Sequence, residues 1–227
     1  MTRPTSGPLL AIDTSGTSAL VALGAADGTL IADRRWQAGY RHGEELLTRI
    51  DEMIHSAGVP LAELAAIVVG TGPGAFTGLR VGLATAKALA HGLGIPIIGV
   101  ATSAALLDGS GIGVGKQAVL LLPAGPSDRV FVVAGEATLV KGGDEPELPA
   151  DAVLVAVDLP ARAPDEALAL GAVAETALPA SLVRLGAARL AADPAGDDVA
   201  RLVPEYVTLP RGVTSSKGEV RWSHDRR

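Results

Sequence analysis

The chain has 227 residues, of which 48% are hydrophobic and only 3% aromatic, and its formal net charge is −6. This length allows one sizeable core or two small lobes, and the core must consist mainly of Ala, Val, Leu and Ile. Cysteine is absent, which excludes disulfides, thiolate metal sites and a cysteine nucleophile, and the negative charge disfavours independent binding of tRNA or DNA.

The first part of the chain predicts an antiparallel meander followed by a helix. Short apolar runs at 9–14, 19–25 and 30–36 are separated by turns that contain Gly or Asp-Gly, as hairpins require. Apolar residues from Leu46 onward then recur with helical spacing, which predicts a helix over 42–57.

The next part alternates strand and helix. We predict a buried strand at 65–70, a helix at 75–92 and another strand at 95–100, which implies parallel pairing with a right-handed crossover. Small residues recur at four-residue spacing along the second helix, so it can approach a neighbour closely; they are Gly78, Gly82 and Ala86, with Ala84 and Ala88 nearby.

After Ser103 the pattern weakens. We expect strands at 118–122 and 130–133, loops and short strands across 135–164, and a helix over 182–192. The element order predicts an α/β protein with a ribonuclease H-like or actin/Hsp70/sugar-kinase (ASKHA) fold, with two lobes, the second reduced. The expected parts are an N-terminal lobe at 1–103, a smaller C-terminal lobe at 104–209, and a flexible basic tail at 210–227.

The tail has five basic and two acidic residues, a net charge of +3. Together with Trp222 it could contact RNA phosphates, although a disordered solubilising end is the commoner role of such a tail. Residues 1–8 lack the apolar region of a signal peptide, and the apolar stretch 78–100 contains charged residues that would be costly in a bilayer. We expect a cytoplasmic protein without a membrane span.

A carboxylate and two hydroxyls, Asp13, Thr14 and Ser15, follow the first predicted strand. In sugar-kinase-like lobes this place meets metal and phosphate, so one interpretation of the three residues is a relic phosphate turn. The alternative is that their side chains cap a hairpin by bonding to the backbone, and turn chemistry favours it.

The densest motif is the glycine-rich segment 70–80. It is not a P-loop, because Leu79-Arg80 follows Gly78 where Lys-Ser or Lys-Thr is required. It is not a dinucleotide fingerprint either, because Thr77 occupies the place of the third glycine. A structural turn with close helix packing explains it better than an anion site.

Histidines occur at 42, 55, 91 and 224, so no two have the spacing that places a ligand pair on one helical face. The residues support neither a metal site nor a Ser-His-Asp arrangement. We therefore predict no catalytic residue and no metal ligand.

Three motifs, in this order and spacing, resemble the TsaB-type (YeaZ-type) family. They are Ala11-Ile12-Asp13-Thr14-Ser15, His42-Gly43-Glu44, and the run from Gly72 to Arg80 with Ala86-Lys87-Ala88-Leu89-Ala90. The resemblance covers residues 9–107 and fades beyond, although Pro204-Glu205-Tyr206 is similar to the family's Pro-x-Tyr element. At 122–129 the chain departs from the family's Asp-Ala-Arg stretch.

The resemblance implies an inactive homologue that pairs with the catalytic subunit TsaD, works with the ATPase TsaE, and is needed for threonylcarbamoyladenosine formation beside the tRNA anticodon. It also implies that the chain has no cofactor of its own, and that ATP or ADP and a metal are bound by the partner subunits. Contact with tRNA is expected only through the complex, and the isolated chain could form a homodimer. The catalytic subunit holds its metal through a His-x-x-x-His element, whereas here Leu46 stands at the second His position after His42.

The family's partner surface implies interface residues in the two N-terminal helices; by motif match these are His42, Glu44, Leu46, Phe76, Thr77 and Arg80. The same apolar stripe must also face the chain's own sheet. Two alternatives stay open: a small-molecule kinase-like or glycoprotease-like enzyme of the same fold, and an interaction module outside tRNA modification.

Overall fold

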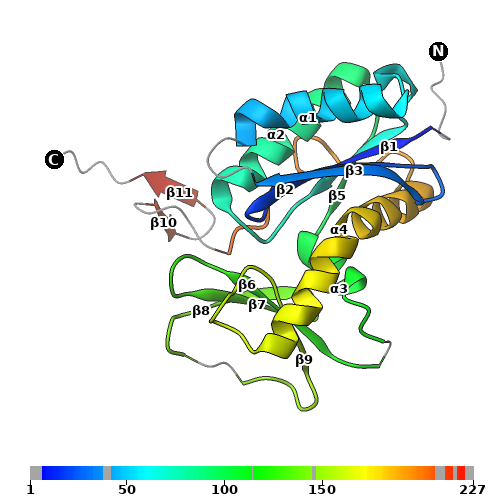
Figure 1. Cartoon of the computed structure of the whole chain (residues 1–227). Helices are drawn as coiled ribbons and strands as arrows, with labels where there is room; N and C mark the ends of the chain where they lie inside the picture. The colour runs from blue at the N-terminus through cyan, green and yellow to red at the C-terminus, as the bar shows by residue number, and fades with distance from the viewer. Residues whose placement is uncertain are drawn as a thin grey trace.

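A computed structural model shows two lobes joined by a long helix (Figure 1). The structure describes residues 7–37, 42–113, 115–144, 147–207, 213–216 and 219–222.

The first lobe contains a five-stranded sheet with the order β3-β2-β1-β4-β5. Its strands are β1 (Leu9–Asp13), β2 (Ser18–Gly24), β3 (Leu30–Gln37), β4 (Ala66–Gly70) and β5 (Ile97–Val100). β1, β2 and β3 pair antiparallel, whereas β4 pairs parallel with β1, and β5 parallel with β4. The predicted meander and the parallel strands after it are confirmed.

Helices cover both faces of this sheet, so β1 is buried along its whole length. On one face, α1 (His42–Ala57) and α2 (Phe76–Leu93) pack onto Leu10 and Ile12; the helix between α1 and β4 is the short η1 (Leu61–Glu63). On the other face, the end of α4 (Asp165–Ala192) packs onto Leu9 and Ala11. Successive side chains of a strand point to opposite faces, which explains this division of β1 between two cores.

The second lobe contains a four-stranded sheet with the order β8-β7-β6-β9. Its strands are β6 (Ala118–Pro123), β7 (Arg129–Val133), β8 (Glu136–Val140) and β9 (Val153–Ala156). β6, β7 and β8 pair antiparallel and β9 pairs parallel with β6, so this sheet repeats the β3-β2-β1-β4 arrangement without a fifth strand. The predicted ASKHA-type α/β fold with a reduced second lobe is confirmed.

Two helices connect the lobes: α3 (Thr102–Gly109), which the sequence did not predict, and α4. α4 contacts β9 in the second lobe and β1, β2, β4 and β5 in the first. The sequence predicted only its last part, 182–192, because its apolar residues face different cores before and after Pro179 and follow no single helical stripe. By length and composition α4 could cross a membrane, but here it packs against strands of both sheets.

After α4 the chain continues along the first lobe. The Asp197 amide donates to the Ile97 carbonyl at 2.8 Å, and the Glu205 amide donates to the Thr71 carbonyl at 2.8 Å. The chain therefore crosses between the lobes more than once, and the lobe limits at 1–103 and 104–209 stay a prediction.

Within the predicted tail, β10 (Val213–Ser216) pairs antiparallel with β11 (Glu219–Trp222). The rest of 210–227 lies outside the described residues, so the flexibility of the tail stays a prediction.

Candidate functional site

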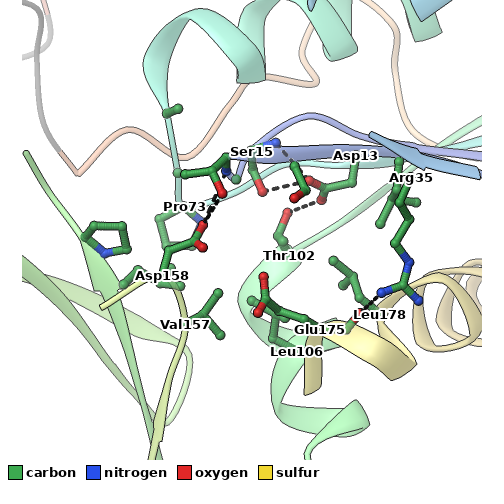
Figure 2. A pocket seen from close by; sticks show the side chains of 18 of the residues that line it. Asp13, Ser15, Arg35, Pro73, Thr102, Leu106, Val157, Asp158, Glu175 and Leu178 are labelled. Atoms are coloured by element: carbon green, nitrogen blue, oxygen red, sulfur yellow. Dashed lines mark hydrogen bonds between the residues drawn. The ribbon is translucent and has the colours of Figure 1, made fainter. Parts of the chain in front are cut away.

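A cleft of about 850 Å³ lies between the two lobes (Figure 2). The first lobe contributes the β1–β2 turn, the end of β3, the turn before α2, and α3. The second side comes from the ends of β6 and β9 and from the middle of α4. Small-molecule sites commonly have volumes in this range.

Asp13 ends β1 at the edge of the cleft, and its carboxylate is almost completely buried. Thr102 Oγ1 donates to Asp13 Oδ2 at 2.6 Å, while the amide and hydroxyl of Ser15 donate to Oδ1 at 2.8 and 2.7 Å. Both oxygens are therefore engaged inside the protein (Figure 2). The bond from the Ser15 amide is the side-chain to backbone contact that the capping interpretation expects, whereas the other two bonds join side chains.

Stability should depend on pH through Asp13, because burial raises its pKa although the hydrogen bonds from Thr102 and Ser15 lower it. A carboxyl with a raised folded-state pKa binds its proton more tightly when folded, so its ionisation costs stability as pH rises through that pKa. Asp13→Asn removes this cost. The free energy of unfolding of Asp13→Asn, relative to the unchanged protein, should therefore rise between the ordinary aspartate pKa and neutral pH. Urea unfolding at both pH values measures the difference; a constant or falling difference would contradict the prediction.

Thr14 ties the same turn to α2. Its hydroxyl donates to the Gly78 carbonyl at 2.6 Å, and a side chain at Gly82 would overlap Thr14 Oγ1. The buried small residues Gly78, Gly82 and Ala86 of α2 therefore face the chain's own first sheet. The spacing of these small residues predicts that α2 approaches a neighbour closely, and in the structure that neighbour is this sheet.

The glycine-rich turn before α2 packs on the β1–β2 turn. The Gly72–Pro73 peptide is cis, and Gly72 has a φ of 101°, a conformation that favours glycine. The Gly72 amide donates to Thr102 Oγ1 at 3.1 Å, and the Ala75 amide donates to the Ser15 carbonyl at 2.7 Å. These contacts agree with a structural role for the turn.

The second lobe presents an apolar counterpart to Asp13. In the first sheet Leu9 pairs with the first residue of β4, and in the second sheet Ala118 pairs with the first residue of β9. Leu9 and Ala118 therefore occupy equivalent places, and Leu122 corresponds to Asp13, because each lies four residues further along its strand. Leu122 and the residues 123–125 line the cleft without a carboxylate or a cation. This side of the cleft is therefore poorly suited to phosphate.

Arg35, at the end of β3, holds the middle of α4. Its Nη1 donates to the Glu175 carbonyl at 2.6 Å and its Nη2 to the Thr176 carbonyl at 2.5 Å. Pro179 lies in α4 and has no N–H for the carbonyl four residues earlier, which is that of Glu175. Arg35 thus satisfies a carbonyl that the proline leaves free.

Two acidic residues of the second lobe also line the cleft, Asp158 after β9 and Glu175 on α4. Asp158 has a φ of 55°, and its Oδ2 accepts hydrogen bonds from the hydroxyl and amide of Thr17 at 2.7 and 3.3 Å, which link the lobes. Burial, followed by the negative charge of Asp158, raises the pKa of Glu175, while Arg35 lowers it.

Sequence reasoning missed Arg35, Thr102, Asp158 and Glu175. Asp158 follows a buried apolar run as Asp13 does, and that signal was available in the sequence. Glu175 lies in the part of α4 that was not predicted, so no signal placed it near Asp158.

The predicted interface residues of α1 have different surroundings. His42 begins α1, but its side chain lies outside the described residues, and Glu44 is exposed. Leu46 is 0% exposed and packs in the core between α1 and the first sheet. Its assignment to a partner interface was wrong, because the helical stripe turns it inward, whereas its neighbour Leu47 is 57% exposed.

The predicted interface residues of α2 lie together near its start. Thr77 and Arg80 are exposed, and Phe76 is half-buried. The Arg80 guanidinium lies 5.2 Å from the centre of the Phe76 ring, and the Tyr206 ring centre lies 4.9 Å from that of Phe76. The Pro-x-Tyr element at 204–206 is thereby brought to the predicted interface.

Comparison with known proteins gives a family match over residues 37–192, to TsaD, tRNA N6-adenosine threonylcarbamoyltransferase. The tRNA threonylcarbamoyladenosine biosynthesis protein TsaB of Escherichia coli (strain K12) is 35% identical over 45% of this chain and 43% of its own length. An uncharacterized protein of Mycobacterium leprae (strain TN) is 44% identical over 40% of this chain and 26% of its own.

The solved structure of YeaZ from Pseudomonas aeruginosa superposes with a TM-score of 0.65 at 25% identity, covering 88% of this chain and 99% of that chain. The matched stretch spans less than half the length of the curated relatives, from 18% to 48%. The family match, by contrast, covers well over half of this chain. The chain belongs to the family of the tRNA N6-adenosine threonylcarbamoyltransferase TsaD, and within it is a TsaB/YeaZ-type protein.

Proposed function

We propose that this chain is a non-catalytic partner of a TsaD threonylcarbamoyltransferase, needed to form threonylcarbamoyladenosine at the adenosine beside the tRNA anticodon. The observation that carries the proposal is the place of Leu46. It stands where the resemblance puts the second histidine of the catalytic subunit's metal element, and its side chain is 0% exposed in the core. A core leucine at that place cannot coordinate a metal ion.

The cleft supports the same proposal. Asp13, at the place where sugar-kinase-like lobes meet metal and phosphate, has both oxygens bonded to Thr102 and Ser15. Its counterpart in the second lobe is Leu122. A kinase-like enzyme would need phosphate-binding groups on both sides, so these residues favour a partner over an enzyme of the same fold.

The outer face of α1 and α2 supplies a surface for the partner. Thr77, Arg80, Ala84 and Ala88 are exposed at spacings of three or four residues, so they share one face of α2. Exposed alanines on this face let another helix approach closely. Leu47 adds an exposed apolar side chain from α1.

We further propose that this surface binds TsaD in a heterodimer, or a second copy of the chain when the partner is absent. TsaE would act on the heterodimer, with ATP or ADP and metal bound by the partner subunits. The net charge of −6 favours tRNA contact through the complex alone. The complex would work in the cytoplasm, without membrane attachment.

The test is threonylcarbamoylation of tRNA in a mixture of threonylcarbamoyl-adenylate synthase, TsaD and TsaE with threonine, bicarbonate and ATP. We expect the modified adenosine only when this chain is added, and no modification by the chain without TsaD. Modification that does not depend on the folded chain would overturn the proposal, as would modification by the chain and the synthase without TsaD.

A further inference from the structure

The charges that face the cleft do not balance. Its charged lining residues are Asp13, Arg35, Asp158 and Glu175, three acids and one base among the described residues. Asp13 is engaged by three donors, and Arg35 is engaged by the carbonyls of α4. The four side chains carry a net charge of −2 when all are ionised, and Asp158 and Glu175 are the two acids whose oxygens are left to bind a ligand.

Both acids keep acceptor capacity. Asp158 accepts from Thr17 through Oδ2 alone, and within the described part of the chain its Oδ1 has no hydrogen bond. The Glu175 carboxylate likewise accepts no hydrogen bond from the described residues, and it points into the cleft below Thr102 (Figure 2). Burial and the negative charge of Asp158 raise the pKa of Glu175, and the positive charge of Arg35 lowers it; a cation placed between the two acids would be favoured by both of their charges.

Most of the remaining wall of the cleft is apolar, although Ser18, Gln37 and Thr176 also line it. Leu106 of α3, Leu122 of β6, Val157 after β9 and Leu178 of α4 all line it. The described residues contain no group of three or more acidic or histidine side chains that could hold a metal ion. A hydrocarbon chain with one positive end therefore matches this lining better than a bare cation or a phosphate does.

We propose that the cleft binds a small aliphatic amine, whose ammonium group donates to Glu175 and Asp158 and whose hydrocarbon chain packs on Leu106, Leu122 and Leu178. This site is separate from the outer face of α1 and α2, and the proposal does not depend on the role in tRNA modification.

The test is calorimetric titration of the whole chain with hexylamine, and with 1-hexanol as a neutral probe of the same length. We expect hexylamine to bind with one site and an affinity about tenfold higher than that of hexanol, because only the amine makes charge-assisted hydrogen bonds. Glu175→Gln keeps the shape of the side chain and should weaken amine binding about tenfold. Asp158→Asn should also weaken amine binding, because it removes a negative charge. Asn tolerates the positive φ of this position, so the local backbone should be kept.

Glu166→Gln is the matched control, because Glu166 is exposed on the first turn of α4 and does not line the cleft. Its affinity for hexylamine should be unchanged. Equal binding of hexylamine and hexanol, equal loss in Glu166→Gln and Glu175→Gln, or absence of amine binding to a folded chain would each overturn the proposal. So would tighter binding of a lysine-rich peptide than of hexylamine, which would assign the cleft to a protein partner.

Discussion

Gly171→Ala is expected to lower the free energy of unfolding by about 1–3 kcal/mol, the usual cost of overpacking a well-packed core. Gly171 lies in α4 where the helix meets β9, and a methyl group there would overlap the Ala156 carbonyl oxygen. A backbone carbonyl in a paired strand cannot rotate away as a side chain can. The helix or the strand would have to shift, and urea unfolding measures the resulting loss of stability.

The matched control is Gly92→Ala in α2. Gly92 is exposed, and a methyl group there would meet no atom within 4 Å. The same substitution should stabilise this helix by at most about 1 kcal/mol, because alanine has the higher helix propensity. Equal effects at the two glycines would show that α4 does not pack so closely on β9 at Gly171 that a methyl group is excluded.

Gly171 also connects packing to the cleft. It sets the distance between α4 and the end of β9; Glu175 lies four residues after it on α4, and Asp158 lies two residues after the last residue of β9. A shift of α4 would therefore change the position of Glu175 as well as the stability. Gly171 is thus a positioning residue for the cleft.

The first lobe could be predicted because its elements are regular in the sequence. Strand runs such as 9–13 are bounded by turn residues, and the apolar stripe of α1 repeats from Leu46 to Ala57, over about three turns. The helix α1 faces a single core, so its helical period is visible. In α4 the period is lost, because Ala174 faces the second lobe and Val183 the first.

The candidate site could be predicted only in part for a related reason. Asp13 and the glycine-rich turn were found because local chemistry marks a turn. Arg35 and Glu175 are joined through a carbonyl freed by Pro179 and lie 140 residues apart in the chain. No local pattern reports a contact of that separation. Leu46 shows the opposite failure. The motif match assigned it to an interface, but its position in the helical period of α1 turns it into the core.

The buried and exposed sides of α2 together restrict where a partner can bind. Gly78, Gly82 and Ala86 are buried on the chain's own sheet, so they cannot serve a second contact. Ala84 and Ala88 lie on the exposed side of the same helix. Any helical partner of α2 must therefore approach over its exposed side, on which Thr77, Arg80 and these two alanines lie.

Ala84→Arg is accordingly expected to reduce threonylcarbamoylation of tRNA in the reconstituted mixture by about tenfold or more, the effect of losing about 1.4 kcal/mol of association. A long charged side chain at this position would hold the two helices apart, and its charge would be desolvated in the contact. The rate at limiting concentration of this chain measures the effect. High concentrations should restore part of it, because weaker association is overcome by mass action.

Ala169→Arg is the control, because Ala169 is exposed on α4 in the second lobe, away from α1 and α2. It makes the same chemical change at an exposed helical position, so the modification rate and the unfolding midpoint should stay close to those of the unchanged protein. If both variants fold normally and Ala84→Arg supports full modification at limiting concentration, the outer face of α2 is not the surface that binds TsaD. The partner contact would then have to lie elsewhere, and the exposed alanines of α2 would have no part in it.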